Sequence, residues 1–380
     1  MLDTARRTVF TADHDLFRDQ VRRFFEREMI PHLDRWEVQG IADRDFWTKS
    51  GAAGLLCPTV PEAYGGLGLD FGFNAVIDEE LGYAGSSAGI SLHSDIVAPY
   101  IVAYGSEEQK QRWLPRMISG ETPTAIAMTE PAAGSDLQGI RTTAVKDGDD
   151  YVLNGSKTYI TNGQHAELVI VVAKTDPAEG AKGTSLILVE SDRPGFARGR
   201  NLDKIGLHGQ DTSELFFQDL RVPRSNLLGA EGMGFAYLMN QLPQERLAIA
   251  IGAQAAAQRA FDEAVRFTRE RKAFGRTVFE FQNTRFTLAD LAAKLQAGWA
   301  HLDWALARHN AGRLTAGEAS AAKLWHTELQ WEVCDASLQL HGGAGYMNEY
   351  LIARLWRDAR VTRIFGGTNE IMKEVIAREI

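Results

Sequence analysis

The sequence predicts an α+β protein in three parts, helical at both ends and built of strands in the middle. Apolar residues recur at helical spacing up to about residue 120, short β-rich runs follow, and a long helical stripe returns after about residue 232. At about 150 residues per domain, 380 residues suggest two to three domains. We therefore expect a helical domain at 1–121, a central β-barrel or sandwich domain at 122–230 and a helical domain at 231–380.

The first part is predicted to be helical from about residue 13. Apolar residues lie at roughly helical intervals before Pro31, namely Leu16, Val21, Phe24, Phe25 and Met29. A second helix is expected over residues 106–117. Ser106 would cap it, with Gln109 three residues later as the reciprocal partner of a capping box.

The central part changes to strand patterns. Asn154-Gly155 lies between two apolar arms and predicts a hairpin turn, because a type I′ turn needs positive φ at both central positions. Three more β-rich runs follow at 168–173, 184–189 and 214–222, joined by segments with Gly, Pro, Asp and Asn. Several short strands in so few residues are typical of a compact barrel or sandwich.

The last part returns to helices. One apolar stripe of a long helix consists of Leu288, Leu291, Ala292, Leu295, Trp299, Leu302 and Leu306. Thr315 with Glu318 predicts a capping box at the start of the next helix, which is expected to end at Gly342-Gly343.

Composition narrows the class of protein. Hydrophobic residues make up 44% and charged residues 24%, which is typical of a globular protein and argues against a disordered chain. The net charge of −9 argues against a general nucleic-acid binder. Cys57 and Cys334 form no CxxC pair, so neither a disulfide framework nor a cysteine zinc site is indicated.

The length of the apolar runs and the first 20 residues indicate where in the cell the protein is expected. No apolar run approaches about 18 residues, so no membrane-spanning helix is expected. The first 20 residues carry both charge signs and lack the pattern of a signal or transit peptide, so we expect a cytoplasmic protein.

Several familiar motifs are absent or weak. Residues 85–89 match the G-x-S-x-G nucleophile elbow around Ser87, but the acidic, helix-like segment before them favours a connection between helices. No G-x-G-x-x-G follows a strand, and neither a P-loop nor an H-E-x-x-H pattern occurs. The sequence therefore predicts no Rossmann, P-loop or zincin site, and no metal.

Four segments are more informative. Residues 128–136, MTEPAAGSD, lie where helix gives way to strand; their hydroxyls at Thr129 and Ser135 suit a polar planar ring or a phosphate-bearing ligand. Residues 271–275, RKAFG, and 339–343, QLHGG, each end a helix. Residues 365–370, FGGTNE, place two glycines before the final helix.

Together these motifs, in this order and spacing, strongly resemble the acyl-CoA dehydrogenase family over essentially the whole chain. LPQER at 242–246 and GGTNEIMKEVIAREI at 366–380 look most like the long-chain branch. The resemblance implies a C-terminal four-helix bundle, FAD bound without a covalent link, and a homotetramer. It implies dehydrogenation of a fatty acyl-CoA to the trans-2-enoyl-CoA, with electrons passed to electron-transfer flavoprotein.

The resemblance also implies site residues. In the family the flavin lies between the β-domain and the bundle, and Arg271, Gln282 and residues 339–343 would reach the FAD of a neighbouring subunit. The FAD-binding positions it implies are Ile126, Met128, Thr129, Gly134, Ser135, Tyr159, Ile160, Thr161, Arg271, Gln282, Gln339, Leu340, Gly342, Gly343, Thr368 and Glu370. The substrate-binding positions are Ser135, Arg246, Gly366 and Gly367.

The catalytic base requires a choice. Many relatives carry Glu directly before the Gly-Thr of the last motif, where this chain has Gly366. A minority branch has the base in an earlier helix, at the position of Glu245. Glu245 lies in the apolar stretch 235–251, where Pro243 is expected to distort the helix. Adjacent helical residues point about 100° apart, so an ion pair with Arg246 is disfavoured, and we predict Glu245 as the base.

Four functions are compatible with the sequence. The first is an acyl-CoA dehydrogenase that uses electron-transfer flavoprotein, and the second is a flavin acyl-CoA oxidase that uses O₂. The third is a thioester hydrolase built on Ser87, and the fourth is an acyl-CoA-binding subunit without activity. The motifs favour the first, while the acyl chain length stays open.

Overall fold

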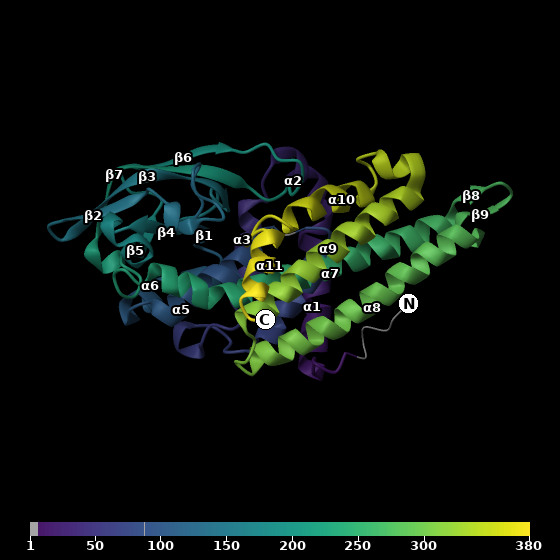
Figure 1. Cartoon of the computed structure of the whole chain (residues 1–380), viewed down its shortest axis with the longest axis horizontal. Coiled ribbons are helices and arrows are strands. Elements are labelled where there is room, and N and C mark those ends of the chain that lie inside the picture. The colour runs from purple at the N-terminus through teal and green to yellow at the C-terminus, as the bar shows by residue number, and fades with distance from the viewer. Residues whose placement is uncertain (1–6, 87) are drawn as a thin grey trace.

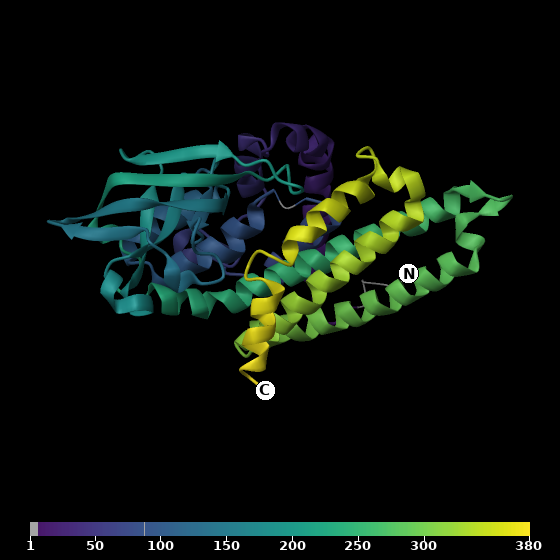
Figure 2. The same cartoon turned by 45° about the horizontal axis from the view of Figure 1, so that its top comes forward.

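A computed structural model describes residues 7–86 and 88–380. It has a helical N-terminal part, a curled sheet in the middle and a helical C-terminal part, which confirms the predicted fold class (Figure 1). Figure 2 shows the sheet at one end of an elongated molecule, with long helices extending to the other end.

The N-terminal part consists of short helices before the sheet. They are α1 (Ala12–Glu28), α2 (Leu33–Gln39), α3 (Arg44–Ala52), α4 (Phe71–Ala84), the π-helical turn η4 (Leu92–Val97), α5 (Ala98–Tyr104) and α6 (Glu107–Ile118). The predicted capping box of α6 is confirmed: the Ser106 hydroxyl accepts from the Gln109 N–H, and the Gln109 side chain accepts from the Ser106 N–H. Ser87, the residue of the G-x-S-x-G pattern, lies outside the described residues.

The sheet has seven strands: β1 (Thr124–Ala127), β2 (Thr143–Asp147), β3 (Asp150–Thr161), β4 (Leu168–Lys174), β5 (Thr184–Glu190), β6 (Phe196–Asn201) and β7 (Thr212–Pro223). Their order is β1-β4-β2-β3-β7-β6, and β5 pairs with β4. The pairs of β4 with β1 and β2 are parallel, and the other pairs are antiparallel. The three β-rich runs predicted from the sequence correspond to β4, β5 and β7.

The predicted hairpin at Asn154-Gly155 is wrong. Both residues lie inside β3, and the turn is formed by Gly148 and Asp149, between the paired ends of β2 and β3. The Asn154 side chain instead bonds to Asp219, where β7 bulges. A Cβ on Gly155 would lie 2.4 Å from the Thr142 hydroxyl, so this glycine serves a close approach of two strands and not a turn.

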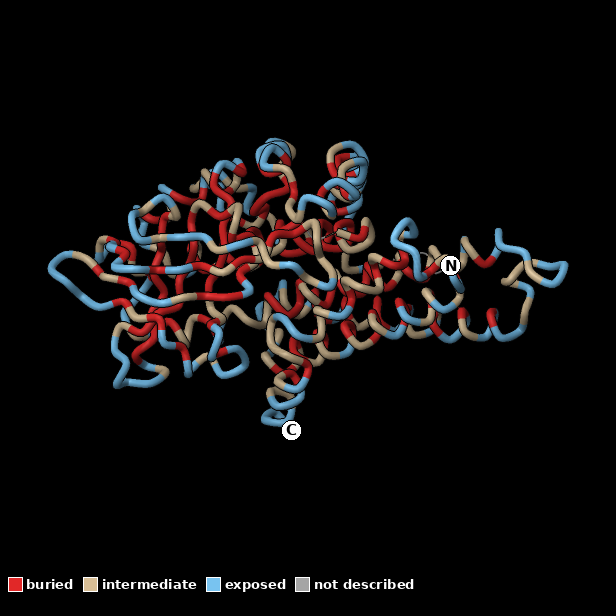
Figure 3. Tube along the Cα trace, turned by 90° about the horizontal axis from the view of Figure 1, so that it is seen from above, coloured by how far each residue is buried: buried red, intermediate tan, exposed pale blue. Residues whose placement is uncertain are grey.

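β4 joins two cores, because it is buried along its whole length. Leu168, Ile170 and Val172 pack with the N-terminal helices, while the residues between them face the interior of the curled sheet. The sheet and the N-terminal helices are therefore one packed unit, and Figure 3 shows many buried stretches of chain inside this region.

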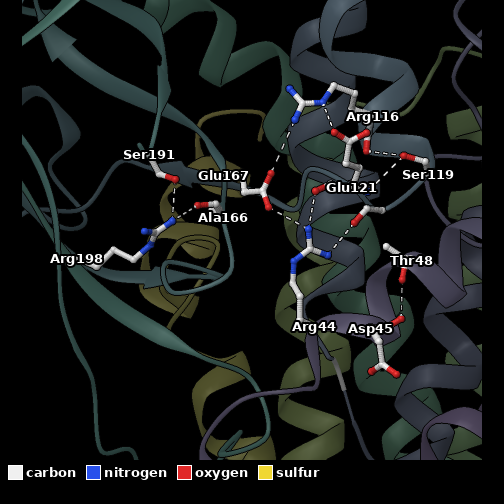
Figure 4. A network of polar contacts seen from close by, with 11 residues as sticks. Arg44, Asp45, Thr48, Arg116, Ser119, Glu121, Ala166, Glu167, Ser191 and Arg198 are labelled. Atoms are coloured by element: carbon white, nitrogen blue, oxygen red, sulfur yellow. Dashed lines mark hydrogen bonds and ion pairs between the residues drawn. The ribbon is translucent and has the colours of Figure 1, made fainter. Parts of the chain in front are cut away.

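Polar contacts at the surface also hold α3 and α6 to the sheet (Figure 4). The Arg44 guanidinium donates to the carbonyl oxygens of Gly120 and Glu121 and to the Glu167 carboxylate at 3.0 Å. Arg116 binds Glu121 at 2.9 Å, and Arg198 binds Ser191 at 2.7 Å. The contact of Arg44 with Glu167 ties the loop before β4 to α3, and the contact of Arg198 with Ser191 ties β6 to the turn after β5.

The C-terminal part is a bundle of long helices. It comprises α7 (Gly234–Glu270), α8 (Gln282–Asn310), α9 (Ala316–His341), α10 (Leu351–Thr362) and α11 (Asn369–Ala377). A two-stranded hairpin of β8 (Lys272–Ala273) and β9 (Arg276–Thr277) joins α7 to α8 at the end far from the large sheet (Figure 1).

Most of the predictions made from local sequence patterns in the bundle are confirmed. The leucines and Trp299 of the predicted α8 stripe are buried, the Thr315 capping box begins α9, and α9 ends at Gly342. α7 continues through Pro243 as one helix, so the distortion expected there does not end the helix. None of the helices in the described part of the chain is long and apolar enough to cross a membrane.

Candidate active site

Glu245 is a buried carboxylate in the middle of the molecule. It lies on α7, which packs against α4, α9 and the η4–α5 segment, and only 4% of the residue is exposed. The Tyr100 hydroxyl donates a hydrogen bond of 2.8 Å to Glu245 Oε1. Burial raises the pKa of Glu245 to about 7, against the opposing effects of the Tyr100 hydrogen bond and the Arg246 charge.

Arg246 points elsewhere, as the helical geometry predicted. Its Nη1 donates to the Ser320 hydroxyl on α9 at 3.0 Å, and it forms no ion pair with Glu245. Its buried Nε has no hydrogen-bond partner among the described residues. Burial lowers the pKa of Arg246. Burial, together with the charge of Arg246, also lowers the pKa of Lys323. Arg246 is the cation that acts on Glu245, and Lys323 lies beyond it at the 366–369 turn.

The FGGT turn before α11 meets α7 at this point. A Cβ on Gly366 would lie 2.3 Å from Ile249 Cδ1, and Ile249 is one helical turn after Glu245. Both glycines have positive φ, +63° and +91°. Lys323 Nζ, fully buried, holds the turn by donating to the Gly367 carbonyl at 2.8 Å. The structure thus brings Glu245, Arg246 and the glycine pair together.

The backbone of this turn offers unused donors. The N–H groups of Gly366 and Gly367 donate to no other described residue. Thr368 caps α11 through its hydroxyl, and Glu370 is exposed in the first turn of that helix. Unpaired N–H groups beside a carboxylate suit a ligand with an oxygen that gains negative charge.

A second group of predicted residues forms an edge of the sheet. Ile126 is in β1, and Met128 and Thr129 follow it, while Ile160 and Thr161 end β3. The Thr158 N–H donates to the Thr129 carbonyl at 2.9 Å, which ties the two segments together. Gly134 and Ser135 are exposed on the loop beyond.

Glu130 and Lys157 are site residues that the sequence reasoning missed. Lys157 is fully buried, and its Nζ donates to the Glu130 carboxylate at 2.8 Å and to the Met128 carbonyl at 2.9 Å. Glu130 also accepts from the N–H groups of Arg141 and Thr142. This ion pair fixes the MTEPAAGSD segment, and the sequence carries no local signal for it because Glu130 and Lys157 are 27 residues apart.

Tyr159 is turned outward by a β-bulge between Lys157 and Ile160. Its φ is +59°, a costly conformation for a residue other than glycine, and the residue is 70% exposed. An exposed aromatic face in a strained backbone, two residues before Thr161 at the end of β3, fits a planar heterocycle such as a flavin.

The remaining predicted cofactor residues lie at the far end of the bundle. Arg271 is 26 residues after Glu245, about 39 Å along α7, and Gln282 begins α8 nearby. The others are Gln339, Leu340, Gly342 and Gly343 at the end of α9. Arg271, Gln282 and Gln339 are exposed, and their side chains make no hydrogen bond to another described residue. One chain does not bring this group to the Tyr159 edge.

The donor set as a whole fits FAD. Residues at the sheet edge offer an aromatic face and hydroxyl groups for a ring, and Arg271 offers an unpaired guanidinium for a phosphate. A hollow of about 500 Å³ elsewhere, between α6 and the loop after β5, contains none of the predicted site residues. Its arginines pair with carboxylates: Arg112 and Arg193 with Glu190, and Arg116 with Glu121.

Comparison with known proteins identifies the family. Models of the acyl-CoA dehydrogenase N-terminal, middle and C-terminal domains match residues 11–121, 125–220 and 232–380. The chain belongs to the acyl-CoA dehydrogenase family. It is therefore an FAD-dependent oxidoreductase, as the sequence predicted.

Individual relatives agree with this assignment. The pig long-chain specific acyl-CoA dehydrogenase, mitochondrial, is 51% identical over 100% of this chain and 89% of its own. The crystal structure of an acyl-CoA dehydrogenase from Geobacillus kaustophilus has a TM-score of 0.97 at 53% identity, covering 98% of this chain and 99% of that one. A Mycobacterium smegmatis glutaryl-CoA dehydrogenase solved with FADH2 has a TM-score of 0.93 at 28% identity, covering 99% and 96%.

Proposed function

We propose that this acyl-CoA dehydrogenase converts a fatty acyl-CoA to the trans-2-enoyl-CoA, with Glu245 as the base that removes the α-proton. The observation that carries the proposal is a buried carboxylate with a pKa of about 7, located beside the glycine turn at 366–367. The 51% identity to a long-chain specific relative supports a long-chain substrate.

The surroundings of Glu245, the glycine pair and Arg246 indicate the role of each in the proposed reaction. A carboxylate with a pKa near 7 is a stronger base than an exposed one, yet about half of it is ionised at neutral pH. The free N–H groups of Gly366 and Gly367 would donate to the thioester oxygen as negative charge develops there. Arg246 would contribute positive charge at the same place.

The cofactor would be held by two chains. Tyr159 and the segment fixed by Lys157 and Glu130 would hold the ring, and Arg271 of a neighbouring copy would bind the pyrophosphate. FAD held there would supply the acceptor for the β-hydrogen of the substrate as a hydride, and the electrons would go on to electron-transfer flavoprotein.

The separation of the two FAD-binding groups supports a homotetramer. Residues at the far end of the bundle cannot serve the FAD of their own chain. Large apolar side chains are exposed there, with Phe274 at 95% exposure, followed by Phe286, Tyr346 and Met347. The domain boundaries after residues 121 and 230, and a cytoplasmic location, stay proposals.

The test is the variant Glu245→Gln. Gln is nearly isosteric and still accepts a hydrogen bond from Tyr100, so fold and FAD content are expected to persist. The single-turnover rate of flavin bleaching by a panel of acyl-CoAs, measured without oxygen, is expected to fall by about 10²–10⁴. The matched control is Glu26→Gln, which changes an exposed carboxylate on α1.

The outcomes separate the candidate functions. Bleaching by Glu245→Gln at the wild-type rate would show that another carboxylate is the base. Steady peroxide formation by the wild type without an added acceptor would favour an oxidase over the use of electron-transfer flavoprotein. A well-folded protein that cannot be reconstituted with FAD would overturn the proposal as a whole.

A further inference from the structure

Tyr100 makes the one hydrogen bond that a described side chain forms with Glu245. Its hydroxyl donates to Oε1 at 2.8 Å, and Tyr100 is fully buried on α5. The other carboxylate oxygen, Oε2, accepts no hydrogen bond from another described residue. The carboxylate is therefore held by one oxygen and leaves the second available.

We propose that Tyr100 is a positioning residue that orients the Glu245 carboxylate and keeps it sufficiently ionised to act as a base. This proposal rests on the proposed function, in which Glu245 removes the α-proton. A hydroxyl that donates to one oxygen stabilises the ionised form and restricts rotation of the group, so that Oε2 is presented to the substrate.

The fold provides a reason for this placement. The π-helical turn η4 leads directly into α5, and a π-turn changes which side chains face a neighbouring helix. Gln244, the residue before Glu245, donates to the Asp95 carbonyl of η4 at 2.7 Å. The segment that carries Tyr100 is thus attached to α7 at two adjacent residues, which fixes the distance between hydroxyl and carboxylate.

Other titratable groups near this part of α7 do not replace Tyr100. On α7 itself, Arg246 acts on Glu245 through its charge and points to Ser320. Buried titratable groups on the other packed elements are Asp78, Glu79 and Glu80 on α4, His93 and Asp95 on η4, and Lys323, His326 and His341 on α9, while His309 on α8 is half-buried. Among them, His309 binds Gln244, Lys323 binds the 366–369 turn, and none bonds to Glu245.

Two substitutions that change the donor strength of the Tyr100 hydroxyl in opposite directions are expected to shift the pKa of Glu245 in opposite directions. Tyr100→Phe removes the donor and keeps the ring, so the pKa of Glu245 is expected to rise. The acid limb of the pH profile of flavin bleaching would then move up by about one pH unit, a tenfold change in the ionisation constant. Replacing Tyr100 with 3-fluorotyrosine makes the hydroxyl a stronger donor and is expected to move the limb downward.

The control is Tyr104→Phe, the same substitution one turn later on α5. The Tyr104 ring stacks on Tyr237 with centroids 3.8 Å apart, and its hydroxyl makes no contact with Glu245. The acid limb of the pH profile of flavin bleaching by Tyr104→Phe is expected to stay at the wild-type pH. A purely structural role for Tyr100 would lower rate or stability without moving the limb.

The experiment separates this proposal from the one on which it rests. If Glu245→Gln is inactive but neither change at Tyr100 moves the acid limb, the positioning role is wrong and the base assignment stands. If Glu245→Gln keeps the wild-type rate, the base assignment itself is wrong. If Tyr100→Phe does not fold, the shift of the acid limb in the 3-fluorotyrosine protein tests the positioning role, because that protein keeps every contact of the native side chain.

Discussion

Burial of Glu245 should make the enzyme less stable than its inactive variant. The pKa of this carboxyl is about 7 in the folded protein and 4.5 in an unperturbed carboxyl. Between these values the folded state binds the proton more tightly than the unfolded state, so stability is lost as pH rises through this window. A pKa difference of about 2.5 corresponds to about 3 kcal/mol, lost in full above pH 7.

Glu245→Gln removes this loss because an amide does not ionise. At about 2.1 cal/mol/K per residue, 380 residues give an unfolding entropy of about 0.8 kcal/mol/K. The variant is therefore expected to melt about 4 °C above the wild type at pH 8, with the difference closing as the pH falls toward 5. Differential scanning calorimetry of both holoproteins, at equal FAD and protein concentrations, measures it.

A melting difference that does not change with pH would refute the reasoning, as would a variant that melts below the wild type at pH 8. Glu26→Gln is again the control, because an exposed carboxylate has no burial penalty to remove. Its melting temperature is expected to follow the wild type at each pH.

Two further predictions concern the cofactor and the position of the base. Arg271→Ala is expected to weaken FAD binding by tenfold or more while turnover at saturating FAD changes little, because a charge-assisted hydrogen bond contributes about 1.5–3 kcal/mol. Equilibrium dialysis measures the FAD affinity of the variant, and an unchanged affinity would contradict the prediction. The swap Glu245→Gly with Gly366→Glu is expected to bleach flavin more slowly than the same swap with Ile249→Ala added, because a Cβ at 366 would lie 2.3 Å from Ile249 Cδ1 and that side chain would have to move. A triple variant no faster than the double one would refute this steric argument.

The sequence predicted the elements that carry strong local signals. The α8 stripe and the capping boxes at Ser106 and Thr315 follow from side chains within one or two turns of each other, and the structure confirms them. The runs that became β4, β5 and β7 are apolar enough to indicate strands on their own. Such signals need no knowledge of the tertiary fold.

The hairpin prediction failed because the same residues serve two purposes. Asn-Gly is favoured in type I′ turns, yet Asn154 here bonds across the sheet to Asp219 and Gly155 allows Thr142 to approach. Both partners are distant in sequence or on another strand. A local pattern cannot distinguish a glycine needed for a turn from one needed for a close contact.

The same limit applies to the candidate site. Glu245 was predicted from its motif, but Tyr100 lies 145 positions away and carries no pattern of its own. Lys157 and Glu130 are likewise joined only by the fold. Buried polar partners of this kind become visible only when the elements that carry them are packed together.

The glycine at 366 and the glutamate at 245 are two parts of one arrangement. With φ at +63°, residue 366 directs its Cβ position at Ile249, on the face of α7 that carries Glu245 one turn earlier. The Lys323 ammonium holds the same turn by its carbonyl oxygen, and Arg246 lies beside it. A side chain at 366 would require the end of Ile249 to move and would adopt a left-handed φ that glycine tolerates best. A glycine at position 366 is therefore consistent with a base carried on α7.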